Sequence, residues 1–235
     1  LPFAGIARAG FIAIQFLKSF VSEGIITNKE FNLFLKSLNT VSKTLIKDKE
    51  ILSKQDFLGK YGHLRPGSYD ILSKNYEQDY DNYFSDKIET HIDETFNFTE
   101  YQISNINAKL LTYELGVDFD QLIIFIKEAI EGRESVKFEF TKSLNQILIY
   151  ITEFGQQLQY GDFSIEDLAH LDVQEIISLY STLDHRHASD ILKSDIKKNR
   201  EFYRYTKAIK LPSIISSPED IYSFMMSDNT ANFIT

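Results

Sequence analysis

The chain has 235 residues, of which 43% are hydrophobic and 25% charged, and this composition excludes a disordered protein, which could not bury enough apolar surface. It contains no cysteine, which excludes a disulfide scaffold, thiolate-bound zinc, iron–sulfur clusters and a cysteine nucleophile. Its net charge of −9 argues against nucleic acid as a partner, because duplex binding relies on Lys and Arg neutralising phosphates.

The first predicted helix lies in the most apolar stretch of the chain, residues 1–20. Its apolar residues recur at helical spacing: Phe11, Ile14, Leu17 and Val21. We expect it to end at Gly24, a residue that tolerates the left-handed conformation after a helix. Because Arg8 and Lys18 interrupt the stretch, it predicts neither a signal peptide nor a membrane span. We therefore expect a cytoplasmic protein with no membrane partner.

A second, long helix is predicted after the capping box Thr27-Asn28-Lys29-Glu30. Its apolar residues continue at helical spacing without interruption: Phe31, Phe34, Leu35, Leu38, Val41 and Leu45. The first two helices are expected to form an antiparallel hairpin. A short helix follows Ser53 and ends before Gly62.

The helical period disappears around residues 62–84. A loop of this length inside a domain is uncommon unless it is functional or disordered. Its first part, KYGHLRPGSYDI, holds four polar side chains between two glycines and a proline: His63, Arg65, Tyr69 and Asp70. Such a turn can approach a ligand closely, and its arginine can bind a carboxylate or phosphate. The alternative is a structural turn in which Arg65 pairs with Asp70, and the residues alone favour neither interpretation.

The helical pattern resumes at Thr99 and again at Asp120. The longest apolar stripe follows, over residues 140–158, and further helices are expected after Ser164, after Asp172 and from His187 to about Lys207. No segment alternates with period two for long enough to predict a strand. The expected fold is therefore all-α: one multi-helix domain over residues 1–235, with helical hairpins and the irregular loop. The sequence also allows a division into residues 1–75 and 88–210.

Two cations, Arg133 and Lys137, lie just after Gly132 and before the longest apolar stripe. They are neighbours on a helix, at positions i and i+4. In the first turn of a helix they would oppose the helix dipole and repel each other, which is costly unless an anion is near. If residues 120–158 formed one helix, the dipole part of this reasoning would not apply. The alternative is that both side chains extend along the edge of the core, with Glu134 or Glu139 as partners.

The histidines do not predict a metal site. His185 and His187 are two residues apart and would point to opposite sides of a helix, so a solvated turn is favoured over a metal centre. No self-contained catalytic motif, such as HExxH, a Walker A loop or GxSxG, occurs in the chain.

Four motifs occur in a fixed order along the chain and are followed by NFIT at its end: PFAGIARAGFIA, KYGHLRPGSYDILSKNYEQ, AIEGRESVKFEFTKSL and NREFYRYTKAIKLPSIISSPEDIY. Together they resemble the central helical region of the phosphoenolpyruvate synthase and pyruvate, phosphate dikinase family, and especially its compact relatives, which include the rifampin phosphotransferases. In that family an ATP-grasp domain binds ATP and Mg²⁺ and phosphorylates a histidine on a swivelling domain. The swivelling domain then carries the phosphoryl group to an acceptor.

The resemblance implies that this chain is the acceptor-binding middle of a larger protein, because neither of those domains is in it. Both chain ends, Leu1-Pro2 and Phe233-Ile234-Thr235, look like cuts through a longer polypeptide. The chain alone is expected to be inactive and to bind no cofactor. Its expected partners are its own ATP-grasp and phosphohistidine domains and a small-molecule acceptor, which is pyruvate or another compound.

The resemblance also implies roles for individual residues. Arg133 and Lys137 would stabilise the charge of the transferring phosphoryl group, and Glu134 would orient the acceptor hydroxyl or act as its base. The residues expected to line the acceptor pocket are His63, Arg65, Tyr69, Asp70 and Arg8. Two alternatives stay open: a non-catalytic helical scaffold that binds proteins through its Tyr and Phe side chains, and the acceptor domain of a rifampin-type antibiotic phosphotransferase.

Overall fold

The computed structural model describes residues 2–85, 95–181, 184–209, 211, 215 and 217–222. Within these residues it contains ten α-helices and no strand, which confirms the predicted all-α fold. The helices are α1 (Pro2–Ser22), α2 (Asn28–Ser37), α3 (Val41–Ile51), α4 (Lys54–Tyr61), α5 (Tyr80–Tyr83), α6 (Glu100–Thr112), α7 (Phe119–Gln157), α8 (Ile165–Leu168), α9 (Val173–Ser178) and α10 (His185–Ala208). Two short 3₁₀ helices follow α9 and precede the end of the described chain: η1 (Leu179–Ser181) and η2 (Pro218–Ile221).

The chain divides into two compact units, residues 1–150 and residues 151–235. The division falls inside α7, whereas the sequence allowed one between residues 75 and 88. Residues before 75 and residues after 88 both belong to the first unit, because its core includes α1, α2, α6 and the first half of α7.

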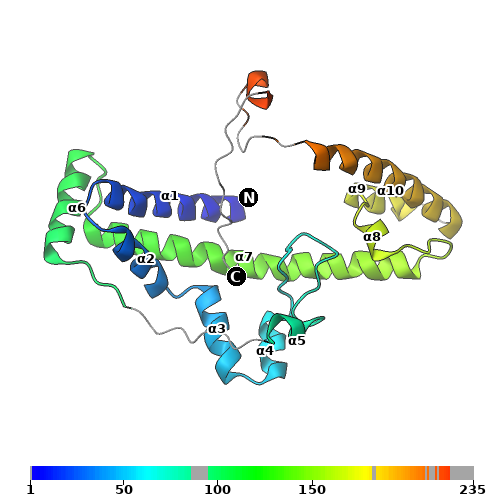
Figure 1. Cartoon of the computed structure of the whole chain (residues 1–235), viewed down its shortest axis with the longest axis horizontal. Coiled ribbons are helices and arrows are strands. Elements are labelled where there is room, and N and C mark those ends of the chain that lie inside the picture. The colour runs from blue at the N-terminus through cyan, green and yellow to red at the C-terminus, as the bar shows by residue number, and fades with distance from the viewer. Residues whose placement is uncertain are drawn as a thin grey trace. The chain divides into compact units, whose positions relative to one another are not determined.

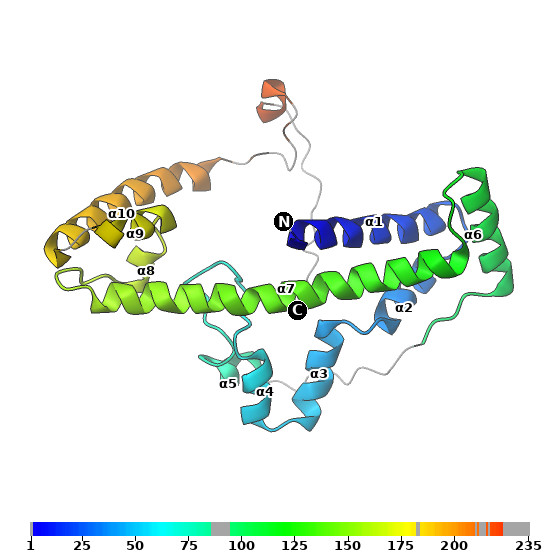
Figure 2. The same ribbon diagram turned by 180° about the vertical axis from the view of Figure 1, so that it is seen from behind.

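The core of the first unit is formed where α1 lies beside the N-terminal half of α7, as Figures 1 and 2 both show. Its buried side chains include Ala13, Leu17, Phe20, Phe34, Ile106, Leu110, Leu122 and Ile126. By length and composition alone, Phe3–Ser22 of α1 is apolar enough to cross a membrane. In this structure Leu17 of the same helix is fully buried in the core, while Phe11 is about half exposed.

The predicted single helix over residues 31–45 is wrong, because it is two helices, α2 and α3. The backbone is extended at Leu38, and the Thr40 side chain caps α3 by accepting a hydrogen bond from the Lys43 backbone N–H. The Asn39 backbone N–H donates to the Glu131 carboxylate of α7, at 2.8 Å. Apolar residues keep their helical spacing through this break, which is why the pattern alone did not reveal it.

The alternative in which residues 120–158 form one helix is confirmed, because α7 runs without interruption from Phe119 to Gln157. Gly132 has open space where a side chain would lie and is simply a position within the helix. Arg133 and Lys137 therefore sit in mid-helix, where the dipole of a first turn does not act on them. Of the two unfavourable effects expected for this cation pair, only the repulsion between the like charges applies.

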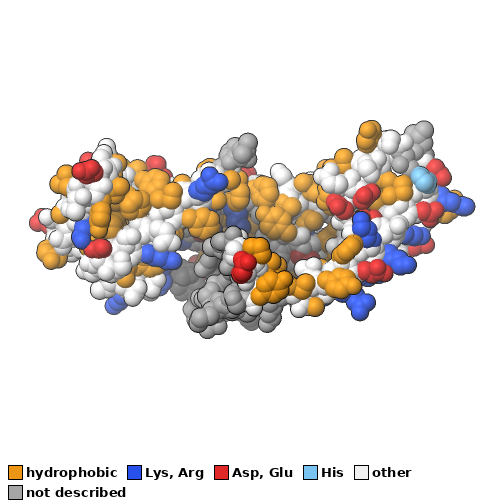
Figure 3. Space-filling view, turned by 90° about the horizontal axis from the view of Figure 1, so that it is seen from above, with side chains coloured by type: hydrophobic (Ala, Val, Ile, Leu, Met, Phe, Trp, Pro, Cys, Tyr) orange, Lys and Arg blue, Asp and Glu red, His pale blue; other side chains and the backbone are white. Residues whose placement is uncertain are grey.

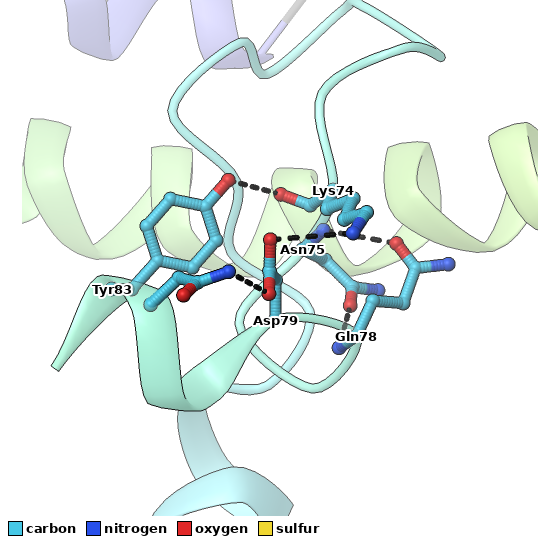
Figure 4. Close-up of polar contacts among 6 residues, drawn as sticks. Lys74, Asn75, Gln78, Asp79 and Tyr83 are labelled. Carbon is cyan, nitrogen blue, oxygen red and sulfur yellow. Dashed lines mark hydrogen bonds and ion pairs between the residues drawn. The ribbon is translucent and has the colours of Figure 1, made fainter. Parts of the chain in front are cut away.

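The irregular loop predicted around residues 62–84 is present, and the short helix α5 closes it. Figure 4 shows how its polar side chains bind the loop's own backbone. The Asn75 side-chain oxygen accepts the Gln78 backbone N–H at 2.8 Å, and the Gln78 side-chain oxygen accepts the Asn75 backbone N–H at 3.0 Å. The Tyr83 hydroxyl donates to the Lys74 carbonyl at 2.8 Å, and the Lys74 ammonium pairs with Asp79. The loop is thus a defined, hydrogen-bonded structure.

Three buried polar residues, Arg65, Asn75 and Asn145, form what we call the polar clamp between this loop and α7. The Asn145 side-chain oxygen accepts hydrogen bonds from the Arg65 guanidinium and from the Asn75 amide. The same guanidinium donates to the backbone carbonyls of Ser73, at 2.9 Å, and Asp70, at 3.3 Å. A buried charge is costly unless it is hydrogen-bonded, so these contacts hold the loop in one position on α7.

The second unit contains the end of α7 and helices α8, α9 and α10. The helices predicted after Ser164 and Asp172 are confirmed as α8 and α9, each capped by that side chain. The helix predicted from His187 to about Lys207 is confirmed as α10. The unit's small core comprises Leu158, Leu179, Ala188 and Leu192, with acidic and basic side chains mixed over α10 in Figure 3.

The Asn145→Ala substitution should lower the free energy of unfolding by about 1–3 kcal/mol, because the substitution leaves the buried donors of Arg65 and Asn75 without their acceptor. Urea unfolding followed by far-UV circular dichroism measures this change. The matched control is Ser143→Ala, an exposed position on the same helix, for which we expect a change within about 0.5 kcal/mol. Equal effects of the two variants would show that the polar clamp does not stabilise the fold.

Candidate functional site

Of the three residues expected to act on the phosphoryl group, Arg133 contacts α1 directly, and Glu134 and Lys137 lie next to it on α7. The Arg133 guanidinium carbon lies 4.5 Å from the centre of the Phe11 ring. A Cβ atom at Gly10 would lie 2.7 Å from Cδ of Arg133, so the absence of a side chain at Gly10 makes room for this arginine. Phe3 stacks on Phe140 farther along, with ring centres 5.5 Å apart. The two helices are therefore antiparallel, and their register places Lys137 level with residues 6–7 of α1.

Lys137 is in a partly desolvated position. Burial lowers the pKa of its ammonium group, and the nearby charge of Arg133 lowers it further, while Glu134 acts in the opposite direction. Oε2 of Glu134 is buried and receives no hydrogen bond within the described part of the chain. Two cations and one carboxylate thus share a region from which water is partly excluded. Such a region can hold a small anion more strongly than an exposed lysine could.

The sequence also allowed a purely structural role, in which the Arg133 and Lys137 side chains extend along the edge of the core. The packing of Arg133 agrees with this role. Its guanidinium already packs on the aromatic ring of Phe11, a contact that stabilises the α1–α7 pair without any ligand. An anion bound here would therefore meet an arginine whose position is fixed in advance by packing.

His63, in the loop, packs against a different part of α7, edge-on to the Phe138 ring with ring centres 4.8 Å apart. Burial lowers the pKa of this histidine, a hydrogen bond with the Phe138 backbone opposes that effect, and the charge of Lys142 lowers the pKa further. Its Nε2 atom is buried with no hydrogen-bond partner from the described residues. The lowered pKa favours the neutral imidazole, and one ring nitrogen is left without a hydrogen-bond partner among the described residues.

The remaining residues that were predicted to line the acceptor pocket do not lie together at one site. Arg65 belongs to the polar clamp, and it binds the backbone carbonyl of Asp70. The Asp70 carboxylate accepts the Leu72 backbone N–H at 2.9 Å, so it serves the turn. Tyr69 is 71% exposed, and Arg8 is exposed on α1. The arrangement of Arg65 agrees with the structural interpretation of the KYGHLRPGSYDI turn.

A surface cavity of about 850 Å³ does open beside His63, within the first unit. It lies between α4, the loop and α7, and its lining includes Lys54, Leu58, His63, Glu77, Lys142 and Asn145. Arg133, Glu134 and Lys137 are not among its lining residues. Arg133 contacts Phe11 of α1, whereas Lys142 and Asn145 line the cavity beside His63, so the two groups lie on different faces of α7.

Sequence reasoning missed Asn145 and Lys142, which shape this cavity. One feature of the sequence pointed to Asn145: it is an amide between Leu144 and Leu148, on a stripe where only apolar residues were expected. Nothing in the local sequence indicated that its partner would be Arg65, which is 80 residues away.

No group of three or more His, Asp or Glu side chains in the described residues is arranged to hold a metal ion. Comparisons of the chain with protein-family models, with curated proteins and with solved structures found no match.

The imidazole of His63 should titrate below pH 6.5, the value of an unperturbed histidine, when its Cε1–H resonance is followed by NMR. We expect Lys142→Gln to raise the pKa of His63 and Glu139→Gln to lower it, because these side chains act on it with opposite charges. The unfolded chain takes up this proton near pH 6.5 and the folded chain only at lower pH. The free energy of unfolding should therefore fall as the pH drops below about 6.5. A midpoint above 6.5, or shifts of the same sign in both variants, would contradict this account.

Replacing Arg133→Gln should raise the pKa of Lys137, because it removes the neighbouring charge that opposes protonation. The lysines can be dimethylated with ¹³C and the Lys137 signal followed from neutral to alkaline pH. Lys142→Gln is the control, since it removes a cation from the same helix that does not act on Lys137. An unchanged Lys137 titration in Arg133→Gln would show that the two cations are not coupled.

Proposed function

We propose that this chain is the acceptor-binding helical domain of an ATP-dependent phosphotransferase of the phosphoenolpyruvate synthase type. The phosphoryl donor would be a phosphohistidine on a swivelling domain, charged by an ATP-grasp domain that binds ATP and Mg²⁺. The acceptor would be a small molecule, pyruvate or another. The enzyme activity belongs to the longer protein, and the domain alone would be inactive.

The observation that carries the proposal is the group of Arg133, Glu134 and Lys137 in a partly desolvated part of the first unit. Phosphoryl transfer requires cations that are already in place where negative charge accumulates on the transferred group. Arg133 is held by its contact with Phe11, and burial places Lys137 in an environment where a nearby anion would be strongly attracted. Glu134 keeps one buried carboxylate oxygen available to accept a hydrogen bond from an acceptor hydroxyl.

A second candidate, a non-catalytic scaffold that binds a protein, has one observation in its favour. Helix α6 leaves large apolar side chains in solvent, with Tyr101 76% and Leu111 81% exposed. Exposed aromatic and aliphatic side chains are common where proteins meet. The sequence of the flanking reading frame separates the two candidates: the phosphotransferase requires ATP-grasp and phosphohistidine segments, and the scaffold requires neither.

The two half-reactions of the longer protein test the proposed roles. Phosphohistidine formation from ATP is measured by ³¹P NMR, and its loss is then followed after addition of pyruvate or rifampicin as the acceptor. We expect Arg133→Gln and Lys137→Gln to slow the acceptor-dependent loss by about tenfold or more, while phosphohistidine forms at its normal rate.

The matched control is Lys127→Gln, which removes an exposed cation from the same helix, outside the cavity beside His63. Its two half-reactions should stay within about twofold of the unchanged protein. If both half-reactions slow equally in Arg133→Gln and Lys137→Gln, the proposed charge stabilisation is wrong. Acceptor phosphorylation by the 235-residue chain alone would contradict its role as one domain of several.

A further inference from the structure

A strained turn follows α7 in the second unit. Tyr160 and Asp162 both have positive φ angles, 65° and 48°, on either side of Gly161. Side chains other than glycine rarely adopt this left-handed conformation, because Cβ comes too close to the carbonyl oxygen. Of the three non-glycine residues with positive φ among the described residues, two lie in this turn.

Helix α10 holds this turn in place through side-chain contacts. The Ser189 hydroxyl, which is fully buried, donates to the Gln159 carbonyl at 2.7 Å. The Lys193 ammonium donates to the Tyr160 carbonyl at 2.6 Å. A Cβ atom at Gly161 would lie 2.5 Å from the Phe163 ring, so a side chain at this position would displace that ring. Backbone strain that the surrounding structure maintains in this way is typical of binding sites.

A pocket of about 400 Å³ opens between the turn and α10. Asp162 and Phe163 line it from the turn, and four cations line it from the helix: Lys193, Lys197, Arg200 and Arg204. Their spacings of four, three and four residues place all four on one face of α10, where like charges repel. The volume is in the range of pockets that take small molecules.

Only two of these cations are compensated. Arg200 pairs with Asp167, and Lys193 is bound to the Tyr160 carbonyl. Lys197 and Arg204 have no hydrogen bond or ion pair in the described part of the chain, although Asp162 and Glu201 also line the pocket. Two cations about 10 Å apart along the helix thus face a pocket whose wall carries the aromatic ring of Phe163.

We propose that this pocket binds a small organic phosphate. Its phosphate oxygens would be held by Lys197 and Arg204, and its apolar part would pack against Phe163. The pocket suits a small molecule better than nucleic acid, since the chain as a whole carries a net charge of −9. The site shares no residue with the group on α7, so it is independent of the proposed transferase function.

The test is calorimetric titration of the 235-residue chain with phenyl phosphate, inorganic phosphate and phenol. Phenyl phosphate should bind with a dissociation constant of about 1 mM or below, and about tenfold more tightly than phosphate or phenol, because only it uses both the cations and the ring. The double variant Lys197→Gln/Arg204→Gln should weaken its binding by about tenfold or more.

The matched control is Lys198→Gln/Lys207→Gln, which removes the same charge from α10 at exposed positions outside the pocket. Binding by this control should stay within about twofold of the unchanged chain. Lys197 and Arg204 are exposed, so the variant should keep its fold, and circular dichroism checks this. If the double variant unfolds, the two single variants give the same readout. No binding of phenyl phosphate at about 10 mM, or equal loss in both double variants, would overturn the proposal.

Discussion

The hydrogen-bonded charge of Arg65, buried between the loop and α7, is the interaction on which the position of the loop and of the cavity beside it depends. Arg65 is only 9% exposed, and three oxygens accept hydrogen bonds from its guanidinium, those of Asp70, Ser73 and Asn145, while its buried Nε has no partner among the described residues. Two of these are backbone carbonyls of the loop itself, and the third belongs to α7. The same contacts that satisfy the charge therefore fix the loop's shape and its position on the helix.

The position of His63 follows from this constraint. The loop places its imidazole edge-on to Phe138 and beside a cavity whose lining includes Asn145 of the polar clamp. Arg65 was expected to line a pocket, and its guanidinium instead supports the wall of one. This distinguishes two groups of residues on α7: those that line the cavity next to His63, and Arg133 and Lys137 on the α1 side, where Arg133 packs on the Phe11 ring.

Local rules predicted much of this fold, and long-range contacts account for what they missed. The caps at Thr27, Thr99, Ser164 and Asp172 were readable because each is a side-chain hydrogen bond to a backbone N–H two or three residues ahead. The break at Leu38 was not, because apolar spacing continues across it while the backbone turns.

The same limit applies to the sites. The cation pair was visible because Arg133 and Lys137 are neighbours on one helix. The polar clamp, which joins Arg65 to Asn145, and the pocket on α10, which faces the strained turn at Tyr160, each depend on residues brought together by the tertiary fold. Helical period could not show either of them, because it describes one element at a time.

The most direct test of the central claim, that Arg133 and Lys137 are placed to bind a phosphoryl group, is the titration of Lys137 with and without inorganic phosphate. The ¹³C-dimethylated lysine signal identifies this residue separately from the cations of α10. An anion bound between the two cations stabilises the protonated lysine, so we expect phosphate to raise the pKa of Lys137 in the unchanged chain and to have less effect in Arg133→Gln. A Lys137 pKa that does not respond to saturating phosphate would contradict the claim.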